Sequence, residues 1–151
     1  MADNKDNVSR EEMIALLNQD LEREYQAIIA YVVYSQVLKG AAYTNIAKEL
    51  ETHAAEELTH AIRIAKQIDY FGGMPAVVPK PVKTSTDAKQ MLQFDLENER
   101  ETILNYRQRI RQAENMREYA LSETLREIIQ QEQEHLTDLA SALGIEAPRI
   151  E

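Results

Sequence analysis

The chain has 151 residues, a formal net charge of −9 at neutral pH and no cysteine. The lack of cysteine excludes disulfides, zinc–cysteine sites and iron–sulfur clusters, and the acidic charge argues against nucleic acid, because phosphate contacts need clustered Lys and Arg. No run is apolar enough to span a membrane and residues 1–7 lack the apolar core of a signal peptide, so we expect one cytoplasmic domain over residues 1–151, with no membrane partner.

Abundant Ala, Leu, Ile, Glu and Arg, with only four Gly and four Pro, predict an all-α chain. The first helix is expected over residues 9–39, because Ser9 and Glu12 form the pattern of a capping box and Gly40 suits the turn after a helix. Glu24 lies within its apolar stripe, which has the spacing of a bundle helix. The other stripe residues are Ile14, Leu17, Leu21, Ile28, Tyr31, Ser35 and Leu38.

A second helix is expected over residues 44–71, ended by Gly72 and Gly73. Its stripe consists of Ile46, Leu50, His53, Glu57, His60, Ile64, Ile68 and Phe71. Residues 72–85 contain all but one of the prolines and no helical period, which indicates an extended crossover. One long connection keeps the second and third helices parallel, so the prediction is an up-down-down-up four-helix bundle.

The third helix is expected over residues 86–113, with its cap within Thr84–Asp87. Its stripe consists of Ala88, Leu92, Leu96, Glu99, Ile103, Tyr106, Ile110 and Ala113. Asn115–Glu118 has the pattern of a second capping box, and the fourth helix is expected over residues 116–143, stopped by Gly144. The stripe of this last helix consists of Leu121, Leu125, Ile128, Glu132, His135, Leu139 and Leu143.

Six charged or metal-ligating side chains thus occupy core positions near the middle of four helices. They are Glu24, Glu57, His60, Glu99, Glu132 and His135. Two Glu-x-x-His pairs are included, and residues three apart share one helix face. Four buried carboxylates without Lys or Arg partners are hard to hold, whereas two divalent ions neutralise them. Misassigned surface residues or a metal-free hydrogen-bonded core are the alternatives. The pattern predicts a dinuclear site with ions about 3.5–4 Å apart.

The ligand types suit two iron ions, with manganese and zinc as other occupants. Following the ligand pattern of carboxylate-bridged metal sites in helical bundles, Glu57 and Glu132 bridge both ions. Glu24 is then the terminal ligand of one ion and Glu99 of the other, and each ion takes one histidine nitrogen. Held in this way, two Fe(II) ions can pass two electrons together to O2 or H2O2.

Tyr31 lies two helical turns after Glu24, where it either hydrogen-bonds a metal ligand, is oxidised beside the site, or is a core tyrosine with a satisfied hydroxyl, which is the commonest case. His53 lies one turn before Glu57. It either contacts a metal ligand from outside, serves metal entry or exit, or is a packed core histidine, and packing is the commonest role. Tyr106 and Tyr70 carry no signal beyond packing.

The six-residue pattern resembles the ferroxidase centre of the bacterioferritin family. Further matches are Leu21–Ala27, Phe71–Pro75, Asp95–Glu99 and the position of Tyr31, and the resemblance spans residues 9–143. It implies a ferritin-like bundle, oxidation of Fe(II) by O2 or H2O2, and a hollow shell that stores or detoxifies iron.

Two departures from the family alter these expectations. Leu58 stands where the family has its haem-ligating methionine, so we expect no haem. Residues 136–151 are too few for a fifth helix, so a homodimer is expected, with a larger hollow shell as the alternative. Apolar residues outside the first helix's seam also favour a dimer. A di-iron or di-manganese oxidase or peroxidase without mineral storage, or a non-catalytic helical protein, are the competing functions.

Overall fold

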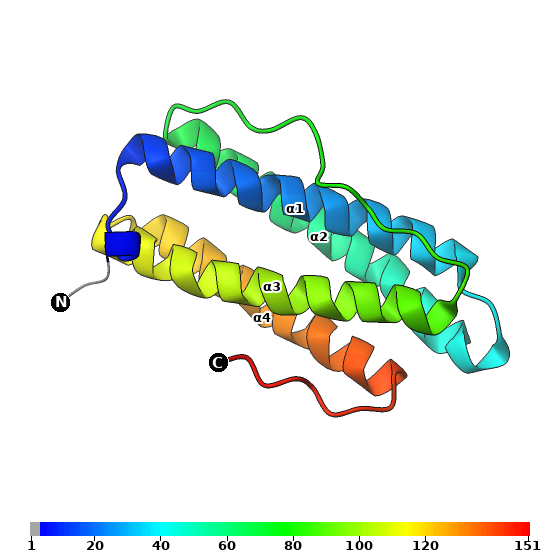
Figure 1. The fold of residues 1–151 in the computed structure, drawn as a ribbon. Coiled ribbons are helices and arrows are strands. Elements are labelled where there is room, and N and C mark those ends of the chain that lie inside the picture. The colour runs from blue at the N-terminus through cyan, green and yellow to red at the C-terminus, as the bar shows by residue number, and fades with distance from the viewer. Residues whose placement is uncertain (1–3) are drawn as a thin grey trace.

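A computed structural model describes residues 4–151, which form a bundle of long helices (Figure 1). The helices are α1 (Arg10–Val37), α2 (Thr44–Tyr70), α3 (Ala88–Asn115) and α4 (Tyr119–Ala142). Two short 3-10 helices, η1 (Asn4–Asp6) and η2 (Ala41–Tyr43), precede α1 and α2. Among the described residues, no helix combines the length and apolar character needed to cross a membrane.

Two antiparallel helix pairs make up the bundle. α1 packs along α2 and α3 packs along α4, and the two pairs lie against each other (Figure 1). The long connection carries the chain from the end of α2 back to the opposite end of the bundle, so that α2 and α3 run parallel. The predicted all-α, up-down-down-up bundle with one long crossover is therefore confirmed.

The crossover is attached to α1 by hydrogen bonds over much of the length of that helix. Asn18 Nδ2 donates to Met74 O at 3.0 Å, and Asn18 Oδ1 accepts from Ala76 N at 2.7 Å. Further along, the Tyr34 hydroxyl donates to Lys83 O. These side chains satisfy backbone groups that have no helix or sheet partner, which explains how an extended segment holds one path across the bundle.

The helix ends agree with the sequence at some positions and differ at others. The first capping box is present, with Glu12 N donating to Ser9 Oγ at 3.1 Å and Ser9 N donating to Glu12 Oε1 at 3.2 Å. The expected role of Gly40 is wrong. α1 ends at Val37 with an extended Leu38 as its C-cap, and Gly40, with φ 110°, instead precedes η2.

The second predicted capping box, Asn115–Glu118, is also wrong. Asn115 is still the last residue of α3, and its side chain donates to Asp6 O at 2.9 Å. Arg117 adopts a left-handed φ of 60°, and Glu118 N donates back to Ala113 O at 2.9 Å. This is the hydrogen-bond pattern of a helix C-terminus, so the segment closes α3 rather than capping α4.

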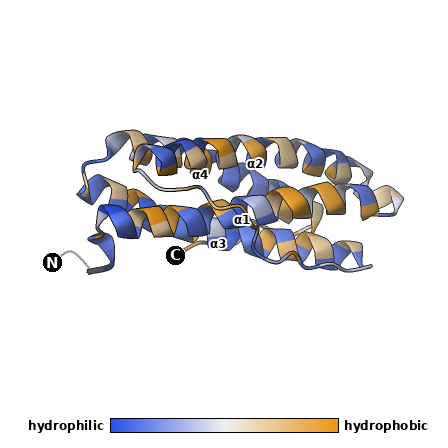
Figure 2. Cartoon of the chain, turned by 90° about the horizontal axis from the view of Figure 1, so that it is seen from above, coloured by the Kyte–Doolittle hydropathy of each residue, from blue (hydrophilic) through white to orange (hydrophobic). Residues whose placement is uncertain are grey.

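Apolar and polar residues alternate along the helices (Figure 2), and the core consists of two apolar clusters, one toward each end of the bundle. The predicted α3 stripe is shifted at two places, where Asp95 and Arg109 are buried while Leu96 and Ile110 are only half-buried. Ile14, Ile28 and Leu143 are also only half-buried. Charged residues in core positions require partners. Several of the buried charged residues lie near the middle of the helices, between the two apolar clusters.

Candidate dinuclear metal centre

The structure brings all six candidate ligands together between the two apolar clusters. α1 supplies one, α3 supplies one, and α2 and α4 supply two each, and every one of the six residues is only 1–2% exposed. They form two overlapping groups whose ligand atoms lie within 4.8 Å of one another. The first group is Glu24, Glu57, His60 and Glu132, and the second is Glu57, Glu99, Glu132 and His135.

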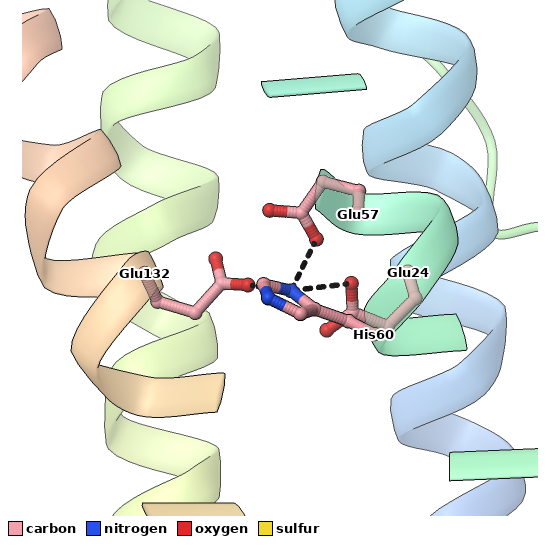
Figure 3. A group of neighbouring side chains, drawn as sticks. All are labelled: Glu24, Glu57, His60 and Glu132. Atoms are coloured by element: carbon pink, nitrogen blue, oxygen red, sulfur yellow. Dashed lines mark ion pairs between the residues drawn. The ribbon is translucent and has the colours of Figure 1, made fainter. Parts of the chain in front are cut away.

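Glu57 and Glu132 belong to both groups, and each divides its two oxygens between them. Glu57 places Oε2 3.4 Å from His60 Nδ1 and Oε1 2.9 Å from His135 Nδ1. Glu132 places Oε1 2.8 Å from His60 Nδ1 and Oε2 3.8 Å from His135 Nδ1. Figure 3 shows the first group, with Glu57, Glu132 and Glu24 converging on the His60 ring. One oxygen on each side is the geometry a bridging carboxylate needs.

Glu24 and Glu99 each belong to one group and are each held by a tyrosine. Glu24 Oε2 lies 3.8 Å from His60 Nδ1, and Glu99 Oε1 lies 3.7 Å from His135 Nδ1. The Tyr31 hydroxyl donates to Glu99 Oε1 at 2.6 Å, and the buried Tyr106 hydroxyl donates to Glu24 Oε1. The interpretation of Tyr106 as packing alone was therefore wrong, since it orients a candidate ligand as Tyr31 does.

The outer nitrogens of the two histidines have different surroundings. His60 Nε2 lies 2.5 Å from Gln131 Oε1, whereas His135 Nε2 lies 3.6 Å from Glu56 Oε1. The His135 ring is also stacked on His53, with ring centroids 4.0 Å apart and planes inclined by 26°. His53 therefore touches the centre, through a ring rather than through a ligand atom.

Without metal, the centre retains protons. Burial first, and then Glu24, raises the pKa of Glu57 well above its usual value. Burial and then Glu57 do the same for the pKa of Glu132. Burial disfavours a charged His60, but contacts with Glu132 and Glu24 outweigh it and raise the His60 pKa to about 10. Burial also acts to raise the pKa of Glu99, but contacts with Glu132 and His135 lower it to about 2.

The donor set passes a direct test of fit to metal. Each of the six residues has at least one buried side-chain atom that makes no well-formed hydrogen bond within residues 4–151, although His60 Nδ1 and His135 Nδ1 lie 2.8 Å and 2.9 Å from Glu132 Oε1 and Glu57 Oε1. These atoms include Glu24 Oε2, Glu57 Oε1, His60 Nδ1, Glu99 Oε2, Glu132 Oε1 and His135 Nδ1. Buried polar atoms are rarely left unpaired, and carboxylate oxygens mixed with imidazole nitrogens suit iron, manganese or zinc. Their role as metal ligands is a prediction that the geometry makes specific.

A repeat in the sequence would have revealed more of this site. Each ligand on α3 or α4 lies 75 positions after its counterpart on α1 or α2, and so does Tyr106 after Tyr31. The same spacing relates Asp20 to Asp95, two buried acids that the helical stripes did not predict. Asp20 binds Arg109 through two contacts of 2.7 and 3.1 Å.

Comparison with known proteins agrees with this fold and site. A ferritin-like, diiron-carboxylate protein from Bacillus anthracis str. Ames is 33% identical, with a TM-score of 0.85 over 89% of this chain and 96% of that one. A dodecameric thioferritin, the bacterioferritin-related protein of Bacteroides fragilis, is 29% identical, with a TM-score of 0.84 over 91% of this chain and 88% of that one. A bacterioferritin of Brucella melitensis is 25% identical over 88% of this chain and 83% of its own length.

The family model for the ferritin-like domain matches residues 14–146, which include all six candidate ligands and the crossover. With a long loop between the second and third helices and a buried glutamate–histidine site suited to two metal ions, the chain belongs to the ferritin-like domain family.

Proposed function

We propose that the chain is a di-iron ferroxidase of bacterioferritin type, which oxidises Fe(II) with O2 or H2O2 for iron storage or detoxification. The observation that carries this proposal is the division of the Glu57 and Glu132 carboxylates, each with one oxygen toward His60 and one toward His135. Two positions that share two carboxylates suit a pair of ions acting together. Fe(II) is the substrate in this reaction, and manganese and zinc are expected to compete for the same ligands.

The side chains around the ligands set their positions and protonation. Tyr106 and Tyr31 donate to Glu24 and Glu99, which leaves the other oxygen of each carboxylate free to bind metal. Gln131 holds the outer nitrogen of His60 and so fixes the ring with Nδ1 toward the carboxylates. Because the pKa of His60 is raised to about 10, its Nδ1 proton must leave before that nitrogen can bind a cation.

Two bound Fe(II) ions would supply the two electrons that reduce one molecule of O2 or H2O2. Oxidation of two Fe(II) ions to Fe(III) releases two electrons, which with two protons convert O2 to H2O2, or H2O2 to two waters. Protons displaced from His60, Glu57 and Glu132 when metal binds are available for this step, because all three groups have raised pKa values without metal.

Anaerobic protein mixed with Fe(II) and then with O2 or H2O2 tests the proposal. Rapid formation of Fe(III) absorbance at up to two Fe(II) per chain supports it. The matched control is Glu134→Gln, which removes one exposed carboxylate from the same helix as Glu132 and is expected to oxidise Fe(II) at the unaltered rate. Oxidation no faster than in protein-free buffer, in a chain shown to bind two metal ions, contradicts the ferroxidase.

A di-iron or di-manganese oxidase or peroxidase without mineral storage is the second candidate. The described residues after Ala142 form no helix, and Arg107 Nη1 of α3 donates to Ile150 O at 2.7 Å, so these residues offer no fifth helix for contacts in a shell. The similar Bacteroides fragilis protein is a dodecamer, which favours a shell smaller than the family's usual one. Light scattering separates these: a hollow oligomer supports storage, and a lone dimer supports the oxidase or peroxidase.

The homodimer is proposed from apolar surface on α1 and the crossover. Ile29 and Val32 are 40% and 50% exposed, and Val77 is 86% exposed, although each is strongly apolar. Two chains related by a two-fold axis would bury these residues together. A monomer mass in light scattering at micromolar protein contradicts the dimer.

We also propose that no haem binds. Leu58 is half exposed on the outer surface of α2 and offers no lone pair to iron. Protein reconstituted with haem and then gel-filtered is expected to show no stoichiometric Soret band. A band that survives filtration contradicts this expectation.

A further inference from the structure

A second cluster of metal-ligating side chains lies beside the centre, where α2 and α4 meet near the surface. Glu49, His53 and Asp138 each offer one ligand atom, and these atoms lie within 4.8 Å of one another. Glu49 is exposed and Asp138 is half-buried, so the cluster opens to solvent on one side. It shares no residue with the six ligands of the centre.

The cluster includes a buried imidazole, His53, in addition to two acids near the surface. His53 is only 2% exposed, and its Nε2 points outward to Asp138 Oδ2 at 3.2 Å. Its Nδ1 lacks a hydrogen-bond partner among residues 4–151. Tyr31 and His135 hold the ring in place, the first edge-on with centroids 5.1 Å apart and the second by stacking at 4.0 Å. A buried imidazole aimed at two carboxylates is a fixed nitrogen ligand.

Space for an ion and its waters lies over the two acids of the cluster. A cavity of about 180 Å³ is lined by Glu49 and Asp138, together with small and polar side chains of η2, α2 and α4. Neither acid pairs with a Lys or Arg among the described residues, Asp138 meets only the His53 ring, and burial together with Asp138 raises the pKa of Glu49. A cation in this cavity relieves that repulsion.

The other half of the bundle shows what replaces this cluster when it is absent. Shifted by 75 positions, the places of Glu49, His53 and Asp138 are taken by Thr124, Ile128 and Arg63. Arg63 Nη2 pairs with Glu127 Oε2 at 2.5 Å. The position that corresponds to Asp138 thus carries a guanidinium in the half near His60, whereas no Lys or Arg of the described residues pairs with Glu49 or Asp138 in the half near His135.

We propose that Glu49, His53 and Asp138 form a third divalent-cation site, weaker than the two central positions, on the His135 side of the centre. Two carboxylates and one imidazole suit Fe(II), Mn(II), Co(II) or Zn(II), and solvent completes the coordination. The stacked rings place this ion next to the position served by His135, so it is a staging point for cations that reach or leave that half. Binding at this site does not depend on whether the centre oxidises iron.

Co(II) is the probe that tests the third site, with full-length protein first stripped of metal by a chelator. Equilibrium dialysis of the unaltered chain is expected to show three Co(II) per chain, one bound more weakly than the other two. Asp138→Asn and Glu49→Gln are each expected to weaken that third ion at least about tenfold, because even indirect partners of a metal cost that much. Both residues are at least partly exposed, so the variants should fold.

Two further measurements complete the test. Glu134→Gln removes an exposed charge from the same helix one turn away and should keep three Co(II). Crystals soaked in Co(II) should show an anomalous peak between His53 Nε2 and the two carboxylates, and Glu57→Ala should keep that peak while disturbing the centre. Only two Co(II) in the unaltered chain, a third peak elsewhere, or full third-site binding in Asp138→Asn would overturn the proposal.

Discussion

The two halves of the metal centre share their ligands but not their surroundings. His60 and His135 each face Glu57 and Glu132, and each half has its own glutamate held by a tyrosine. Outside that shell, His60 meets the neutral amide of Gln131, whereas His135 has a stacked histidine and Glu56. The inner shell is nearly two-fold symmetric and the outer shell is not.

This difference separates what binds the ions from what controls their access. A symmetric inner shell lets two ions act as one pair, because both share the same two carboxylates. An asymmetric outer shell makes one side more acidic, so ions are expected to exchange through the His135 half first. The two buried aspartates show the same asymmetry in their charge partners. Asp20 is paired with Arg109, whereas Asp95 Oδ2 lacks a hydrogen-bond partner within residues 4–151.

The largest expected effect tests the shared shell. Glu57→Ala or Glu132→Ala should each slow Fe(II) oxidation by at least about 100-fold, because a ligand common to both positions matters more than an outer partner. Without metal, the stability of Glu57→Ala should be unchanged or higher, since burial and Glu24 already raise the pKa of this carboxyl well above its usual value. Glu132→Ala should instead lower the stability of the metal-free chain, because Glu132 holds the proton on His60. Stopped-flow oxidation and thermal unfolding measure the two effects. Equal loss from Glu134→Gln would show that the effect is not local.

The second prediction contrasts the two buried aspartates outside the ligand set. Asp20→Asn should destabilise the chain by about 3–5 kcal/mol, because Arg109 is left buried without its charged partner. Asp95→Asn should change stability little or raise it, since burial followed by Glu99 already raises the Asp95 pKa well above its usual value. Urea unfolding of both variants checks the contrast. Similar losses for the two substitutions would contradict the asymmetry.

The third prediction concerns pH. His60 has a folded pKa of about 10 against an ordinary value of 6.5, so its stabilisation of the metal-free chain is complete below 6.5 and is lost as pH rises through 10. Metal binding displaces the same proton and therefore strengthens over that range, by about 1.4 kcal/mol per proton for each pH unit. The rise in Tm caused by Zn(II) should therefore grow between about pH 6.5 and about pH 8. A constant rise would show that binding releases no protons.

The smallest effect concerns the two tyrosines. Tyr106→Phe and Tyr31→Phe each remove the hydroxyl that orients one terminal glutamate, and each should slow oxidation by roughly tenfold, the equivalent of one hydrogen bond to a charged group. Because the two contacts are related by the repeat, the two losses should be similar. A large loss for Tyr31→Phe alone would show that this hydroxyl has a role beyond orientation, and Tyr70→Phe, on an exposed tyrosine, is the control.

The sequence predicted the bundle because helical periodicity survives where single residues are ambiguous. Each long helix carries an apolar stripe over most of its length, and prolines mark the crossover. The six ligands could be found because charged residues in core positions are costly without a reason. The structure shows that the six residues are buried and lie together in two overlapping groups, while their binding of metal stays a prediction.

What the stripes missed depends on contacts between distant segments. Asp95 and Arg109 lie one position away from Leu96 and Ile110, and spacing alone cannot decide which of two adjacent residues faces the core. The ion pair with Asp20 decides it at Arg109. The end of α3 was misread for a similar reason, since a left-handed Arg117 is not visible in residue type. Tyr106 could have been found from its 75-residue offset to Tyr31.

Anomalous diffraction from crystals loaded anaerobically with Fe(II) tests the central claim most directly. The account predicts two iron peaks between the helices. One peak is expected at His60 Nδ1 with Glu24 and the other at His135 Nδ1 with Glu99, and Glu57 and Glu132 should each give one oxygen to the first ion and one to the second. A single peak, or a structure in which either Glu57 or Glu132 contacts only one ion or faces solvent, would contradict it.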